Sequence, residues 1–85
     1  MDTQNEWETM SIGLNRENFI HNIFEPMFQA NYRKCAEAIG GIRPNYLRDI
    51  IMNPNRDAGT KTLTYIYRFC VRNGLDPYPY IFVKK

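Results

Sequence analysis

The feature that most constrains the fold is the stretch Asn31–Ile51, which has the pattern of two short helices joined by a glycine turn. The apolar side chains of its first half recur one helical turn apart, at Cys35, Ala36 and Ile39. Gly40 and Gly41 then allow a turn, because glycine adopts positive φ without steric cost. Pro44 suits the first position of a second helix. Its apolar face comprises Leu47, Ile50 and Ile51. The pattern therefore predicts two packed helices.

The second of these helices leaves four hydrogen-bonding side chains outside its apolar face: Asn45, Tyr46, Arg48 and Asp49. A short helix with such residues exposed at its start is what the major groove of DNA accepts. An Asn amide pairs well with adenine and an Arg guanidinium with guanine.

This segment resembles the helix-turn-helix of the Cro and phage-repressor family of DNA-binding proteins. The family pattern is a small capping residue, a Leu-Ala pair, a turn glycine, an aliphatic residue and an aromatic-aliphatic pair. The corresponding positions here are Asn31, Cys35-Ala36, Gly40, Ile42 and Tyr46-Leu47. The match continues through Ile50 and, more loosely, as far as Pro77. The sequence departs from the pattern by one extra glycine in the turn and one extra residue between Ile50 and Arg56.

The resemblance implies an all-α domain of four or five short helices that binds double-stranded DNA sequence-specifically. It further implies a transcriptional regulator, namely a repressor of bacterial, phage or plasmid origin, that binds a palindromic operator as a homodimer. By the same resemblance, Asn45 and Arg48 read base edges, with Tyr46 or Asp49 beside them. The residues that it implies as phosphate contacts are Asn31, Tyr32, Arg33, Arg43, Asn53, Asn55, Arg56 and Lys61. The alternative is a protein-interaction module with this fold, such as an antirepressor or antitoxin. Asp49 and an acidic start of the chain favour that alternative.

The distribution of charge is uneven along the 85 residues. Residues 1–30 carry five acidic side chains and one arginine, whereas residues 31–72 carry eight basic side chains and three acidic ones. The positive charge thus coincides with the predicted helix-turn-helix, as expected for a surface that binds a nucleic-acid duplex. A solvated basic surface without a partner is the alternative interpretation.

The composition excludes several other classes of protein. With 44% hydrophobic and 24% charged residues the chain is typical of one small globular domain. No apolar run is long enough to span a bilayer and no signal-peptide pattern opens the chain, so we expect a soluble, cytoplasmic protein. One histidine, no phosphate-binding glycine loop and no carboxylate pair argue against an enzyme. We expect no cofactor and no metal. Cys35 and Cys70 should be buried free thiols, with a disulfide or redox sensor as the alternative.

The segment before the helix-turn-helix divides into a lead and a helix. Residues 1–13 predict a flexible acidic lead, followed by a DNA-binding domain over 14–85. Within the lead, Trp7 either folds back on the core or anchors a partner. Asn15 suits the N-cap of a helix that starts at Arg16. Pro26 should end or kink that helix.

The remainder of the chain predicts a loop over residues 53–59, a helix over residues 60–73 and an aromatic tail. The buried stripe expected on the helix is Leu63, Ile66, Tyr67, Cys70 and Val71. The tail should be extended or a single helical turn, with Tyr78, Tyr80 and Phe82 on one side. It either covers the core of its own domain or pairs with a second copy through Tyr78, Tyr80, Ile81 and Phe82.

Overall fold

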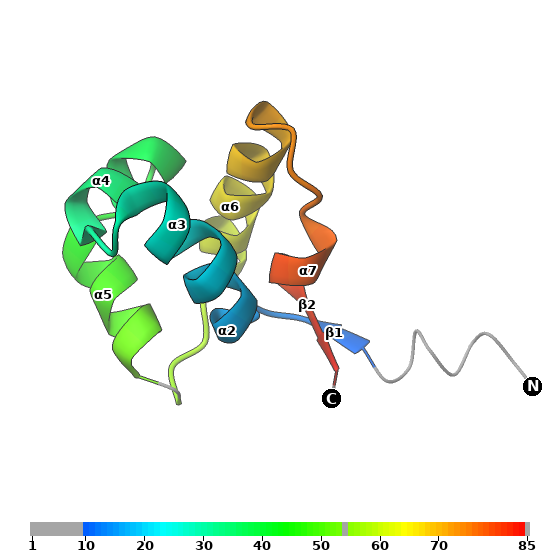
Figure 1. Ribbon diagram of the computed structural model, residues 1–85. Helices are drawn as coiled ribbons and strands as arrows, with labels where there is room; N and C mark the ends of the chain where they lie inside the picture. The colour runs from blue at the N-terminus through cyan, green and yellow to red at the C-terminus, as the bar shows by residue number, and fades with distance from the viewer. Residues whose placement is uncertain (1–9, 54, 85) are drawn as a thin grey trace, which may run out of the picture.

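The computed structural model describes residues 10–53 and 55–84 of the chain and shows an all-α domain (Figure 1). Its helical elements are α2 (Arg16–Phe19), the π-helical segment η1 (Ile20–Phe24), α3 (Glu25–Phe28), α4 (Tyr32–Ile39), α5 (Pro44–Met52), α6 (Thr60–Arg72) and α7 (Tyr78–Ile81). A short ribbon of two strands, β1 (Met10–Ile12) and β2 (Phe82–Lys84), joins the ends of the described chain. In the view of Figure 1, α4 and α5 lie on one side, α7 and the ribbon on the other, and α6 between them.

The core is one apolar cluster to which every helix except α3 contributes a buried side chain. Its largest fully buried members are Phe19, Ile23, Cys35, Leu47, Ile50, Ile66, Phe69 and Cys70. The two cysteines are free thiols, as predicted. Burial raises the pKa of the Cys35 thiol from 9.0 to about 12.

The predicted helix-turn-helix is formed by α4 and α5. The Asn31 side chain caps α4 by accepting a 2.9 Å hydrogen bond from the Lys34 amide. Gly40 and Gly41 form the turn with φ of 79° and 80°. Gly41 also lies against the Tyr65 ring, because a Cβ at this position would meet ring atoms at 2.6 Å. The predicted boundaries of both helices and the role of the glycines are therefore confirmed.

Of the two outcomes predicted at Pro26, an end or a kink of the first helix, the structure excludes the end. Helical residues continue past this proline to Phe28, so Pro26 does not end the helix. Instead, the wider turn of η1 precedes it, and the Glu25 amide donates to the carbonyl five residues back, at Ile20. A π-turn accommodates proline because the missing N–H and the bulky ring disturb the ordinary four-residue hydrogen-bond pattern. Asn15 caps this stretch as predicted, with its side chain 3.1 Å from the Asn18 amide.

The predicted core stripe of α6 is partly wrong. Tyr67 and Val71 are exposed, at 46% and 56% of their surface, whereas Thr62 and Phe69 are buried. The face of α6 that packs on the other helices is therefore rotated by about one position from the predicted one. The error arose because α6 has apolar side chains on more than one face, and the spacing alone does not select among them.

The ends of the chain also differ from the prediction. Residues 10–12, expected in the flexible lead, form β1 and pair antiparallel with β2. The tail combines both predicted forms, since the single helical turn α7 is followed by an extended strand. Because α7 is helical, Tyr80 points to the core while Tyr78 stays exposed, so the predicted shared side is wrong. Trp7 lies outside the described residues. Within those residues, none of the helices has both the length and the apolar character needed to cross a bilayer.

Candidate nucleic-acid interface

The candidate interface is centred on the exposed side of α5. Pro44 occupies the first turn of this helix, and Leu47, Ile50 and Ile51 fix its other side in the core. Asn45 and Arg48, one helical turn apart, therefore face outward. They line a shallow depression of about 280 Å³ together with Asp49 and Met52.

Asn45 and Arg48 are the two predicted base readers that remain unengaged. Within the described part of the chain, neither side chain makes a hydrogen bond or an ion pair. An amide offers a donor and an acceptor, and a guanidinium offers two parallel donors, which match the exposed edges of adenine and guanine. The structure thus brings these two groups together on one open surface.

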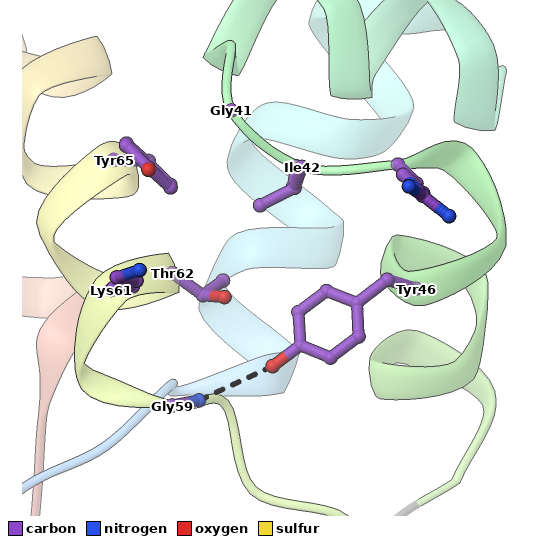
Figure 2. Close-up of a pocket in the computed structure, with 8 residues that line it drawn as sticks. Gly41, Ile42, Tyr46, Gly59, Lys61, Thr62 and Tyr65 are labelled. Atoms are coloured by element: carbon purple, nitrogen blue, oxygen red, sulfur yellow. Dashed lines mark hydrogen bonds between the residues drawn. The ribbon is translucent and has the colours of Figure 1, made fainter.

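Tyr46 and Asp49, the other two predicted base readers, are instead engaged with the loop that follows α5. The Arg56 guanidinium pairs with the Asp49 carboxylate at 2.9 Å and lies 5.5 Å from the centre of the Tyr46 ring. The Tyr46 hydroxyl oxygen accepts a 3.4 Å hydrogen bond from the Gly59 amide (Figure 2). A hydrogen bond with Thr62, then the Gly59 amide and the charge of Arg56, lower the pKa of Tyr46. These side chains join α5 to the loop.

A second hollow separates the start of α5 from the start of α6 (Figure 2). It measures about 450 Å³, and two of the predicted phosphate contacts, Arg43 and Lys61, line it. The α6 amino end adds the partial positive charge of its free amides, and the Gly59 N-cap provides no side chain to bind them. The hollow is therefore electropositive and lies next to the open side of α5.

The remaining predicted phosphate contacts are distributed over α4 and the loop. Arg33 is exposed in the first turn of α4, as is Lys34, which was not among the predicted contacts. Tyr32 is half-buried, with its ring centre 5.0 Å from that of Phe24. Asn31 serves as a helix cap.

In the loop, the side chain of Asn53 accepts a 3.0 Å hydrogen bond from the Asn55 amide, and Asn55 itself is exposed. Asn53 is thus used to shape the loop. Four of the predicted phosphate contacts have an exposed side chain with no described partner: Arg33, Arg43, Asn55 and Lys61.

Two arginines at helix ends were not predicted to have a role. The Arg16 guanidinium donates to three main-chain carbonyls at and beyond the end of α5, those of Ile50, Asn53 and Arg56. The Arg72 guanidinium donates to the Ala38 and Ile39 carbonyls at the end of α4. Among these five carbonyls, the sequence indicates the need for a side-chain donor only at Ile50. The residue four positions later is a proline, which has no N–H to donate to the Ile50 carbonyl.

The residues expected to pair two copies fall into two groups. Tyr80 and Ile81 are each 8% exposed and belong to the core of their own domain. Tyr78 is 62% exposed, and its ring stacks on that of Phe82 with 5.1 Å between the centres. Only Tyr78 and Phe82 therefore remain accessible for a second copy.

Comparison of the chain with protein-family models, with curated proteins and with solved structures finds no significant match.

Proposed function

We propose that this protein is a sequence-specific DNA-binding regulator whose α5 enters the major groove. The observation that carries the proposal is the pair Asn45 and Arg48, exposed and unengaged at the start of the second helix of a helix-turn-helix. Recognition helices of this kind present base-reading side chains at the same place. Repression of bacterial, phage or plasmid genes, and hence a cytoplasmic location, belongs to the same proposal.

The distribution of positive charge supports DNA rather than an unpartnered basic surface. Arg43 and Lys61 line the second hollow beside the start of α5, and Arg33 and Lys34 are exposed at the start of α4, the other helix of the helix-turn-helix. Contacts to phosphates orient a protein on the duplex, and base contacts then specify the sequence. The two kinds of residue occupy adjacent surfaces here, as such a division requires.

The rival function, a protein-interaction module, loses part of its support. Asp49 favoured it because a carboxylate on a recognition helix repels phosphates. In the structure the Arg56 guanidinium pairs with this carboxylate at 2.9 Å, so the local charge is balanced.

Binding of the full-length protein to a random duplex DNA pool over a salt series tests the proposal. Neutralising about four to six phosphates gives a log–log salt slope of about −4 to −5. Arg33→Ala should reduce the magnitude of this slope by about one unit. Glu17→Gln is the control, since it changes the net charge by one unit in the opposite direction, at an exposed position on α2, and should leave the slope unchanged. Absence of binding to any duplex at low salt would refute the DNA function and favour a protein partner.

A further inference from the structure

The Arg16 side chain joins α2 to the end of α5 and to the loop that follows it by three hydrogen bonds. Its Nε donates to the Ile50 carbonyl at 2.8 Å. One terminal nitrogen donates to the carbonyls of Asn53 and Arg56, at 3.0 and 2.8 Å. One planar side chain thus holds the last turn of α5 and two points of the loop beyond it.

The main chain cannot replace the hydrogen bond to the Ile50 carbonyl. In a continuing α-helix the Ile50 carbonyl would accept from the amide of residue 54, but that residue is a proline. Ile50 is fully buried, so leaving its carbonyl without a donor would be costly. A cation is also favourable at this end of a helix because of the helix dipole.

Arg16 is itself held in place from the other side of the molecule. The preceding residue, Asn15, donates its amide to the Tyr80 carbonyl at 2.8 Å. The Asn18 side chain, one turn further along, donates to the Pro79 carbonyl at 2.9 Å. The start of α2 is therefore fixed on α7, and it provides a rigid base from which the guanidinium reaches α5.

We infer that Arg16 is a positioning residue that sets the conformation of residues 53 and 55–57 in the loop after α5. By holding the Arg56 carbonyl, it directs the Arg56 side chain toward Asp49 and the Tyr46 ring. It also holds the segment that carries Asn55 beside the end of α5. The consequence for DNA affinity rests on the proposed function, whereas the consequence for the loop does not.

The test compares Arg16→Lys with Arg72→Lys. Both substitutions keep the charge and replace a planar donor group, bonded to helix-end carbonyls, by an ammonium that cannot reproduce its geometry. Amide hydrogen exchange is measured at Asn53, whose amide donates to the Asp49 carbonyl in α5, and at Asn55 and Arg56, whose amides both donate to Asn53. Arg16→Lys should accelerate exchange there by about tenfold after correction for global stability, and Arg72→Lys should leave it unchanged.

Equal exchange in the two variants would overturn the inference. If Arg16→Lys does not fold, the Nε–H of Arg16 in the wild-type protein gives the answer. Its proton should exchange with water at least about tenfold more slowly than that of the exposed Arg48, and equal rates would overturn the inference.

DNA binding separates this inference from the proposed function. If the wild-type protein binds a duplex, Arg16→Lys should weaken binding to the selected site about tenfold more than Arg72→Lys. Faster loop exchange in a protein that binds no duplex would refute the DNA function and support the positioning role.

Discussion

Two regions of this small domain are held together in different ways. The helix-turn-helix depends on buried side chains such as Leu47 and Ile50 and on local caps such as Asn31. The region around the chain ends depends on main-chain hydrogen bonds between distant residues, for example from the Gly13 amide to the Ile81 carbonyl and across β1 and β2. Packing of buried side chains is lost when a side chain is made smaller. Main-chain hydrogen bonds between the chain ends are lost only when the paired segment itself is removed. The difference teaches that the exposed side of α5 is supported by packed side chains, whereas the chain ends are held by the pairing of their main chains.

The largest effect should follow from a cavity in the helix-turn-helix. Leu47→Ala should lower the free energy of unfolding by about 2–5 kcal/mol, because it empties a fully buried site. Val71→Ala, at a position 56% exposed, is the control and should change it by less than about 0.5 kcal/mol. Denaturant unfolding followed by circular dichroism measures both. Deleting residues 83–85, which removes most of β2, should lower the free energy of unfolding clearly less than Leu47→Ala. An equal loss would contradict the difference between the two regions.

The next effect concerns the proposed recognition of DNA by the exposed side of α5. Arg48→Ala should cost about 1–3 kcal/mol on the selected site and relax the preference at one base pair. Lys61→Ala should weaken all sequences alike and reduce the salt slope by about one unit. Competition binding with single-base variants of the site measures the difference. An unchanged preference in Arg48→Ala would show that another side chain reads that base.

Alkaline pH should destabilise the helix-turn-helix through Cys35. Its pKa is about 12 in the folded protein and 9.0 as the reference value, so between these values the unfolded chain loses a proton that the folded one retains. Stability should therefore fall as pH rises above about 9, by up to about 1.4 kcal/mol per pH unit from this thiol. Cys35→Ala should show a shallower fall over the same range. Identical slopes in urea unfolding at each pH would exclude the thiol as the cause.

A smaller effect is expected at the chain ends, where Tyr78 and Phe82 are accessible. We expect a weak homodimer that a palindromic site strengthens. Tyr78→Asp should weaken it by placing a charge in the contact, with unfolding changed by less than about 1 kcal/mol because Tyr78 is 62% exposed. Sedimentation of the DNA complex gives the number of protomers. One protomer on the best site, in the wild-type protein, would exclude this arrangement.

The smallest effect is expected for Asp49→Asn, which removes the exposed ion pair with Arg56. Both side chains are nearly half exposed, so the stability should change by no more than about 1 kcal/mol. Thermal unfolding at low and high salt measures it. A much larger loss would mean that the Tyr46–Arg56 contact is a main support of α5.

The sequence predicted the helix-turn-helix well because its signals are local. Cap, glycine turn and apolar spacing all fall within neighbouring residues, and Asn31, Gly40 and Pro44 are where the pattern placed them. The β1–β2 pairing and the three carbonyls bound by Arg16 join residues far apart in the chain, and neither leaves a periodic pattern. The engagement of Tyr46 and Asp49 by Arg56 was also missed, because it depends on how the loop after α5 folds and leaves no periodic pattern either.

The two glycines of the turn restrict how this protein can change over evolution. Gly40, with φ of 79° and ψ of 147°, occupies a conformation that other residues strongly disfavour. Gly41 combines positive φ with a Tyr65 ring only 2.6 Å from where a Cβ would lie. Any other residue at either position would therefore strain the main chain. We expect relatives with a one-glycine turn to differ by deletion of a residue, accompanied by a smaller side chain or a shifted ring at position 65.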